Sequence, residues 1–175
     1  MSGFSLYDAT VPSYRQLLGS VTALIGKAEA FCTDRGIAPP EIIGARLAED
    51  MKPFAYQVKS ARVHSIGAIE GVRAGRFGPD ESTPPDSFAG LREQIAAADA
   101  ALAAIEPAEI DGFVGRDMAF VFGEHVVPYR AEQFLLSFAQ PNFYFHVTTA
   151  YAILRERGLA IGKRDYLGRL RKDRG

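Results

Sequence analysis

One stretch decides the fold of this chain: Pro141-Asn142-Phe143-Tyr144-Phe145-His146-Val147-Thr148-Thr149-Ala150-Tyr151. Apolar residues within and just after it recur at steps of three and four, and they share a helical face with His146. They are Phe143, Val147, Ala150, Ile153 and Leu154. This pattern predicts a helix that is buried on the face that carries the imidazole. A histidine in that position is either a functional group or a core side chain that needs a hydrogen-bond partner.

Two earlier segments show the same periodicity. Apolar residues recur at helical steps over residues 14–32, which predicts a first long helix. Pro12 suits the first turn of this helix, and Gly36 suits its left-handed C-terminal end. A second long helix is predicted over residues 50–73, because an aspartate and a proline mark its start.

A connector rich in glycine and proline follows the second helix. Residues 74–86 resist regular structure and predict an exposed loop. The end of this connector, Thr83-Pro84-Pro85-Asp86, has the capping hydroxyl, the proline and the acid of a helix start. The helix predicted after it has a narrow apolar seam of the kind found in bundles: Phe88, Leu91, Ile95, Ala98, Leu102 and Ile105.

The last third of the chain combines a hairpin with a helix. Around Gly123-Glu124 the apolar period changes toward two, which predicts a short β-hairpin within residues 117–127. The last helix is predicted over residues 131–157. We expect it to bend or restart at Pro141, because proline lacks the amide donor that a helix interior requires.

These elements predict an all-α protein, a four-helix bundle with a small β-hairpin inserted before the last helix. The chain of 175 residues is 47% hydrophobic, which suits one core, so we expect residues 1–168 to form a single domain. Residues 169–175 contain four basic side chains and are expected to be a solvated C-terminal tail.

Charge and cysteine content exclude several classes of function. The 20 Lys and Arg nearly balance the 21 Asp and Glu, so no overall field attracts nucleic acid or an anionic membrane. Cys32 is the only cysteine, and the first residues lack the pattern of a secretory signal, which predicts a cytoplasmic location. Charges or prolines interrupt every apolar run before the roughly 20 residues that a membrane-spanning helix needs.

The candidate site is a pocket where His64 of the second helix faces His146 of the last helix. Small or polar residues at helical steps surround His64, which leaves room for a ligand between helices. Asn142 precedes His146 by four residues, so the amide and the imidazole share a face. The predicted pocket residues are Gln57, His64, Ser137, Asn142 and His146. The alternative is that both histidines hold hydrogen bonds within the core.

A metal at this pocket would rest on His64 and His146. Two imidazoles are few, since catalytic zinc usually has three protein ligands and an open position. Serine and asparagine oxygens bind first-row metals weakly compared with imidazole or carboxylate. Cys32 ends the apolar stripe of the first helix, which predicts a buried side chain and not a nucleophile.

The chain also resembles a bacterial family that is known only as a domain of unknown function. The resemblance rests on Asn142-Phe143-Tyr144-Phe145-His146-Val147-Thr148-Thr149-Ala150-Tyr151 and on Ile161-Gly162-Lys163-Arg164-Asp165-Tyr166-Leu167-Gly168. It extends to residues 6–12 and 45–51, so it covers nearly the whole chain. This family is similar to the superfamily of DinB-like and YfiT-like proteins.

The resemblance implies an up-down-down-up bundle, a homodimer, and nickel or zinc on three histidines. His64 and His146 match two of those ligand positions, whereas Ala150 stands where the superfamily has a further histidine. Family members often have histidine in place of Ser137. The implied activity is metal-assisted and thiol-dependent transfer or detoxification of a small molecule. The alternative is a noncatalytic dimeric bundle with a degenerate metal site, which binds a ligand or has a structural role.

Overall fold

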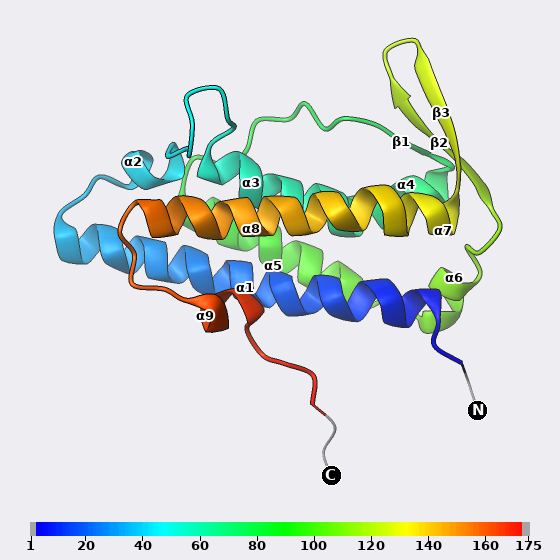
Figure 1. The fold of residues 1–175 in the computed structure, drawn as a ribbon, viewed down its shortest axis with the longest axis horizontal. Helices are drawn as coiled ribbons and strands as arrows, with labels where there is room; N and C mark the ends of the chain where they lie inside the picture. The colour runs from blue at the N-terminus through cyan, green and yellow to red at the C-terminus, as the bar shows by residue number, and fades with distance from the viewer. Residues whose placement is uncertain (1–2, 173–175) are drawn as a thin grey trace.

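The structure is a computed structural model that describes residues 3–172, and it is mostly helical (Figure 1). The helical elements are α1 (Leu6–Arg35), α2 (Pro39–Ile43), α3 (Phe54–Arg62), η1 (Val63–Gly67), α4 (Ala68–Ala74), α5 (Phe88–Ala103), α6 (Pro107–Asp111), α7 (Ala131–Gln133), η2 (Phe134–Ala139), α8 (Gln140–Glu156) and α9 (Lys163–Leu167). Of these, η1 and η2 are π-helical. The strands within the described residues are β1 (Arg76–Phe77), β2 (Asp117–Phe122) and β3 (His125–Arg130).

Helix α1 begins earlier than its apolar periodicity predicted, because Ser5 caps it. The Ser5 hydroxyl accepts a hydrogen bond from the Asp8 amide, and the Asp8 carboxylate accepts one from the Ser5 amide. This reciprocal cap places the helix start at Leu6. The prediction for Pro12 was therefore wrong, since it lies inside the helix and not in the first turn. The predicted end is confirmed by Gly36, which has a left-handed backbone with φ of 65°.

The predicted second helix is one rod made of α3, η1 and α4. Pro53 is the extended residue just before α3. In η1 the Ser65 hydroxyl donates to the carbonyl oxygens of Ala61 (2.7 Å) and Arg62 (3.1 Å). Such side-chain bonds compete with the backbone pattern of an α-helix, and a π segment adds one residue to the local turn. The rod ends at Gly75, where φ is 71°.

Helix α5 carries the predicted seam but starts later than predicted. Ser87 and not Thr83 is the capping residue, and its hydroxyl accepts a hydrogen bond from the Gly90 amide at 3.2 Å. Residues 78–87 therefore have no regular structure. All six seam residues are buried, as the spacing predicted: Phe88, Leu91, Ile95, Ala98, Leu102 and Ile105.

The hairpin prediction is confirmed, but the chain is mostly helical and not all-α, because a third strand joins the hairpin. Strands β2 and β3 pair antiparallel on either side of Gly123, where φ is 57°. Strand β1, which the composition predicted as loop, pairs in parallel with β2. A Cβ at Gly78 would lie 2.7 Å from the Val121 carbonyl oxygen, so glycine allows the chain after β1 to pass close to β2.

The last helical rod runs without a break from α7 through η2 into α8. Its irregular part precedes Pro141. The Gln140 amide donates to the Leu135 carbonyl oxygen, five residues earlier, and Pro141 itself has no amide hydrogen. The π segment η2 therefore accommodates the missing donor, and the rod continues to Glu156.

The long helical segments lie side by side around one core (Figure 1). In this view α1 and α8 run in one direction, while the α3–α4 rod and α5 run in the other. Helix α3 packs against α8 and α5, and α1 packs against the same two helices. Side chains from each of these segments are fully buried, among them Tyr14, Phe54, Leu91 and Phe143. Within residues 3–172, no helix combines the length and the apolar character needed to cross a membrane.

The second resemblance motif forms α9, which folds back onto α1. Lys27 of α1 pairs with the Asp165 carboxylate at 2.5 Å. The same carboxylate accepts a hydrogen bond from the Gly162 amide at 2.7 Å, which caps the start of α9. Gln16 of α1 donates to the Leu167 carbonyl oxygen at 2.9 Å. These contacts give the motif a structural role.

The structure describes only the first part of the predicted basic tail. Residues 169–172 are exposed, but the Arg171 guanidinium donates to the Ser13 hydroxyl at 3.0 Å. This part of the tail therefore contacts α1 and is not fully solvated as predicted. Residues 173–175, and residues 1–2 of the predicted domain, lie outside the described residues.

We expect Gly168→Ala to destabilise the docking of α9 on α1. Gly168 has φ of 60° and ψ of −140°, and a Cβ there would lie 2.3 Å from the Ser20 hydroxyl oxygen. A side chain in such a conformation costs on the order of 1–3 kcal/mol, so the free energy of unfolding in urea should fall by that amount. Gly162→Ala is the control, since a Cβ there meets no atom within 4 Å. Equal effects of the two substitutions would contradict this explanation.

Candidate functional site

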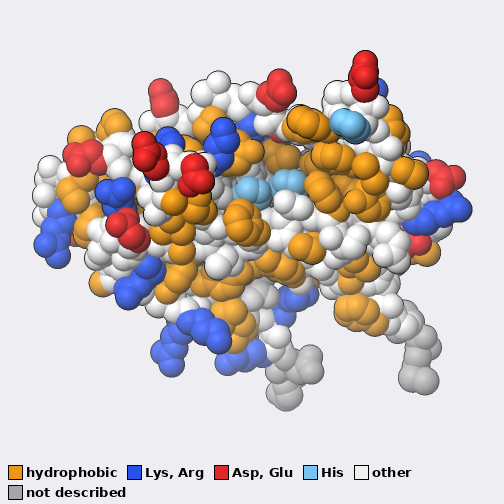
Figure 2. All heavy atoms as spheres, turned by 45° about the horizontal axis from the view of Figure 1, so that its top comes forward, with side chains coloured by type: hydrophobic (Ala, Val, Ile, Leu, Met, Phe, Trp, Pro, Cys, Tyr) orange, Lys and Arg blue, Asp and Glu red, His pale blue; other side chains and the backbone are white. Residues whose placement is uncertain are grey.

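A cavity of about 230 Å³ lies between the second and the last helical rods. Segments α3 and η1 form one wall, η2 and α8 form another, and the sheet with the loop after β1 completes it. The lining residues are Tyr56, Lys59, Ser60, Val63, His64, Phe77, Gly78, Pro79, Asp80, Phe120, Phe138, Asn142 and His146. Figure 2 shows histidine side chains meeting in a hollow of this face, between hydrophobic groups.

The structure brings His64 and His146 together from separate rods. Their ring centroids are 5.4 Å apart, and their planes differ by 13°. The His64 ring also lies beside Phe77 and Phe138, with centroid distances of 5.7 and 5.9 Å. Two imidazoles and two phenyl rings therefore form a continuous wall of aromatic rings along the cavity.

Gln57 determines the tautomer of His146. The Gln57 side chain is buried, and its Nε2 donates to the Lys52 carbonyl oxygen at 2.9 Å. Its Oε1 therefore faces His146 Nδ1, at 2.7 Å. Because a carbonyl oxygen only accepts, Nδ1 carries the proton, and Nε2 of His146 keeps a lone pair. Gln57 was predicted as a pocket residue, but it lies behind His146 and positions that ring.

His64 has no comparable partner. Its Nδ1 is buried and makes no hydrogen bond to any residue that the structure describes. Leaving a buried polar atom unpaired costs free energy, so native proteins do so rarely. The ring that carries this unpaired nitrogen lines the cavity, so the His64 imidazole is a candidate contact for a ligand.

Burial keeps both imidazoles neutral at pH 7. Burial, and secondly the proximity of His146, lower the pKa of His64 to about 4. Burial alone lowers the pKa of His146 to about 4. Histidine in water has a pKa of about 6.5, so both rings are neutral acceptors of hydrogen bonds under ordinary conditions.

Of the predicted pocket residues Asn142 and Ser137, only Asn142 lines the cavity. Asn142 lines the cavity, but its amide donates to the Phe138 carbonyl oxygen at 2.8 Å, one helical turn earlier. Ser137 is exposed, does not line the cavity, and donates to the Gln133 carbonyl oxygen at 2.5 Å. Both side chains satisfy their own helix, so neither forms a polar pair with His146.

Lys59 is a lining residue that the sequence analysis missed. It is only 1% exposed, and its ammonium donates to the carbonyl oxygens of Asp80 (2.7 Å) and Ser82 (2.5 Å). The Asp80 carboxylate lies 3.1 Å from the same ammonium. Burial would raise the pKa of Asp80, but hydrogen bonds from Ser82 and Lys59 lower it to about 2. Helical spacing could have indicated Lys59, because it lies three residues after Tyr56 and four before Val63, which also line the cavity.

Both π-helical segments lie at this cavity. Segment η1 contains His64, and η2 contains Phe138, which packs against the His64 ring. Single π turns inside α-helices occur frequently at functional sites. The two π turns depend on local hydrogen bonds. The spacing of apolar residues does not reveal such bonds, so the sequence did not predict these turns.

The residues present do not fit a metal centre with three protein ligands. Across residues 3–172, no group of three or more His, Cys, Asp or Glu side chains is placed to hold one ion. Ala150, where the resemblance implies another histidine, contributes only a buried methyl group. The candidate donors are therefore His64 and His146 alone, and we assign no chemical step to a metal.

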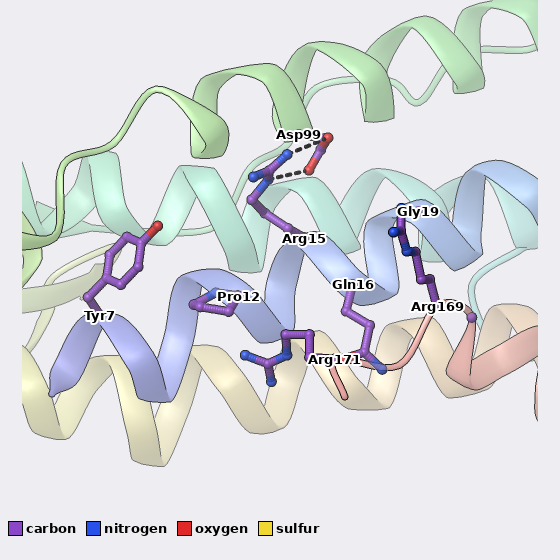
Figure 3. Close-up of a pocket in the computed structure, with 9 residues that line it drawn as sticks. Tyr7, Pro12, Arg15, Gln16, Gly19, Asp99, Arg169 and Arg171 are labelled. Atoms are coloured by element: carbon purple, nitrogen blue, oxygen red, sulfur yellow. Dashed lines mark hydrogen bonds and ion pairs between the residues drawn. The ribbon is translucent and has the colours of Figure 1, made fainter. Parts of the chain in front are cut away.

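A second hollow, of about 480 Å³, lies among α1, α5 and the C-terminal segment (Figure 3). Three arginines line it, but Arg15 donates to the Asp99 carboxylate at 2.8 Å and is paired there. Figure 3 shows Arg169 and Arg171 directed to different sides of the hollow. These cations do not converge on one point, so the histidine cavity remains the candidate site.

The fold places this protein in a known structural class. The chain is similar to the crystal structure of a DinB family member protein from Shewanella denitrificans, with 27% identity and a TM-score of 0.81. The match covers 97% of this chain and 96% of that chain. The protein therefore has a DinB-like fold. It belongs to the family described as Domain of unknown function (DUF1993), which matches residues 6–167. No curated protein matches the chain.

We expect the protein to lose stability as the pH falls from about 6.5 to about 4. In this window the unfolded chain binds protons at His64 and His146 that the folded chain does not bind, so acid favours unfolding. The free energy of unfolding in urea should be lower at pH 5 than at pH 7 by on the order of 1–2 kcal/mol per histidine.

Substitutions identify the source of this pH dependence. His64→Asn and His146→Asn should each reduce the difference in unfolding free energy between pH 7 and pH 5. His125→Asn, at the exposed start of β3, is the matched control and should retain the wild-type difference. The explanation is wrong if the two cavity variants keep the wild-type difference.

Proposed function

We propose that this member of the DUF1993 family binds a small organic molecule in the cavity beside His64 and His146. The observation that carries the proposal is the buried His64 Nδ1, which has no partner within the described part of the chain. A ligand that donates a hydrogen bond to a nitrogen on the cavity side of the imidazole pair would give His64 a partner that the described residues do not supply. The aromatic wall next to this pair supplies the apolar contacts that such a site needs.

The cavity sets the size and chemistry of the ligand. Its volume of about 230 Å³ corresponds to roughly eight water molecules, so the ligand has on the order of ten non-hydrogen atoms. Phe77, Phe120 and Phe138 favour a planar apolar group, and the neutral imidazoles favour an N–H or O–H donor. The Lys59 ammonium is already paired with Asp80 and offers no free charge to an anion. We infer a neutral planar molecule with one polar edge.

The pKa values favour binding over proton transfer. A general base works best when its pKa lies near the working pH. The pKa values of His64 and His146 are about 4, so at pH 7 they are weak proton acceptors. They remain good hydrogen-bond acceptors, because the neutral ring keeps a lone pair. The site therefore suits recognition of a ligand better than removal of its proton.

A thiol-dependent transferase or detoxification enzyme is the alternative function for the same cavity. It is supported by the orientation of His146, since a hydrogen bond from Nδ1 to Gln57 is the arrangement that prepares an imidazole to bind a metal through Nε2. Nickel or zinc chemistry would require a ligand beyond His64 and His146. For that reason we favour the binding function.

We further propose that the DinB-like fold is a four-helix bundle in up-down-down-up order. The directions of α1, the α3–α4 rod, α5 and α8 support this order (Figure 1). The packing of α3 and α1 against both α5 and α8 also supports it. The sheet is then an addition to the bundle that brings Phe77 and Phe120 to the cavity.

We propose that two copies of the chain associate through the outer face of α8. Phe145 is 56% exposed there and takes part in an apolar hollow with Leu47, Met51, Pro141 and Tyr144. Contiguous exposed apolar groups of this kind mark interaction surfaces. The Phe145 ring also packs edge-on against His146, with centroids 5.2 Å apart, so this surface adjoins the candidate site.

Phenol is a probe that matches the cavity in size and chemistry. We expect it to bind at pH 7 with a Kd of about 1 mM or lower in isothermal titration calorimetry. Toluene has the same ring without the hydroxyl and should bind on the order of tenfold more weakly, because it cannot donate a hydrogen bond. If phenol and toluene bind equally, the hydrogen bond to the histidines is not part of recognition.

Variants test where the phenol binds. His64→Leu should weaken binding on the order of tenfold, because the acceptor is lost. Ser137→Ala, outside the cavity, should bind phenol as the wild type does. The proposed binding function is contradicted if neither phenol nor toluene binds, or if His64→Leu has no effect on phenol binding.

We expect Phe145→Glu to separate the two copies. A charge on this face would lose its hydration in an apolar interface, so the variant should sediment as a monomer where the wild type sediments as a dimer. Phe122→Glu is the matched control, because Phe122 is 57% exposed but lies on β2. A monomeric wild type at about 0.1 mM, or dissociation by Phe122→Glu alone, would contradict this interface.

A further inference from the structure

The loop between β1 and α5 covers the histidine cavity. We call residues 78–85 the roof segment. In Figure 1 it runs alongside the α3–α4 rod as the chain returns from β1 to the start of α5. Gly78, Pro79 and Asp80 of this segment line the cavity. A ligand bound beside the histidines is therefore partly enclosed by the roof segment.

The hydrophobic core does not hold the roof segment in place. None of residues 78–85 is buried, whereas Phe77 before them and Phe88 after them are. The first end is fixed because β1, which ends at Phe77, pairs with β2. The other end is stiffened by Pro84 and Pro85, whose φ angles are restricted. The middle of the segment, residues 79–83, must therefore be held by polar contacts.

The buried cation Lys59 supplies most of those contacts. The ammonium of Lys59 has three hydrogens. They face the Asp80 carbonyl oxygen at 2.7 Å, the Ser82 carbonyl oxygen at 2.5 Å and the Asp80 carboxylate at 3.1 Å. All three acceptors belong to the roof segment. Arg62 adds one longer contact to the Asp80 carboxylate, at 3.4 Å.

The same contacts make opening of the roof segment possible. If the segment lifted, the Lys59 ammonium would become exposed, and water would replace its three acceptors. The Asp80 carboxylate would likewise be hydrated and stay charged at pH 7, because an aspartate in water has a pKa of about 3.9. Neither Lys59 nor Asp80 would be left buried without a partner, whether the roof segment is closed or open. Opening would therefore cost less free energy than removing one partner of a buried ion pair while the other stays buried. Segments with few buried apolar contacts are those that open locally in native proteins.

We propose that Lys59 is the latch of a lid formed by the roof segment, and that opening of this lid admits and releases the ligand of the cavity. The role in ligand exchange rests on the binding function proposed above. The latch consists of the contacts of Lys59 with Asp80 and Ser82. Its strength can therefore be tested without any ligand, from the rate at which a reagent reaches the cavity.

A cysteine in the cavity reports this access directly. Ser60 lines the cavity and is 4% exposed, so Ser60→Cys places a thiol under the roof segment. The native Cys32 is buried, and its own rate of labelling, measured in the parent protein, is the background. The rate of modification by N-ethylmaleimide is followed by mass spectrometry at pH 7, with native folding of each variant checked by circular dichroism.

Lys59→Met, in the Ser60→Cys protein, removes the latch while keeping the length of the side chain. We expect labelling to accelerate on the order of tenfold, because the lid spends more time open. Loss of the positive charge would by itself raise the pKa of the introduced thiol and slow the reaction, so acceleration reports access and not reactivity. Lys52→Met is the matched control, since both ammonium groups lie 5.6 Å from the Tyr56 ring and Lys52 is exposed.

A milder variant keeps the proposal testable if Lys59→Met does not fold. Asp80→Asn removes the charged acceptor and keeps the two carbonyl contacts to Lys59, so labelling should accelerate on the order of threefold. The latch is overturned if a folded Lys59→Met protein labels at the rate of the Lys52→Met control. It is also overturned if Asp80→Asn, when it alone folds, labels at the parent rate. If phenol does not bind but labelling accelerates in the Lys59 or Asp80 variant, the proposed binding function is overturned and the lid is retained.

Discussion

A buried hydrogen bond from His146 Nδ1 to Gln57 Oε1 joins the two helical rods that enclose the cavity. Both groups are held where water does not compete freely, so each must be satisfied by the other. The Gln57 amide is in turn fixed by the Lys52 carbonyl oxygen, which sets the tautomer of the histidine. This chain of bonds orients the His146 imidazole, which stacks on the ring of His64, and one nitrogen of the His64 ring has no partner among the described residues. The hydrogen bond between Gln57 and His146 therefore both joins the two rods and orients the His146 ring at the cavity.

The cavity exists because segments far apart in the sequence meet alongside the two helical rods. The sheet supplies Phe77 and Phe120, and η2 supplies Phe138, so the aromatic wall comes from three separate regions. Lys59 joins the roof segment to α3 and replaces the apolar contacts that this segment lacks. The strands and the roof segment form the rest of the cavity wall, so the histidine pair lies in a partly enclosed hollow (Figure 2).

Hydrophobic periodicity predicted the long helices well, because burial of one face is what the sequence period records. It failed where a local hydrogen bond decides the outcome. Ser5 and Ser87 cap α1 and α5, and these caps displaced the starts that Pro12 and Thr83 had suggested. The pairing of β1 with β2 brings together strands about forty residues apart, which no local pattern contains.

For the site, spacing placed His64 and His146 on inward faces, and the structure brings the two rings together. Spacing could not place Ser137, because η2 alters the helical phase around it, nor show that Lys59 is engaged by a distant loop. The π turns also affect how relatives are compared. Each adds one residue to a turn, so a helix that lacks the insertion differs in register by one position beyond it. An alignment drawn without a gap in residues 63–67 or 134–139 would then equate side chains that point about a quarter-turn apart, and a ligand position inferred from it would be assigned to the wrong residue.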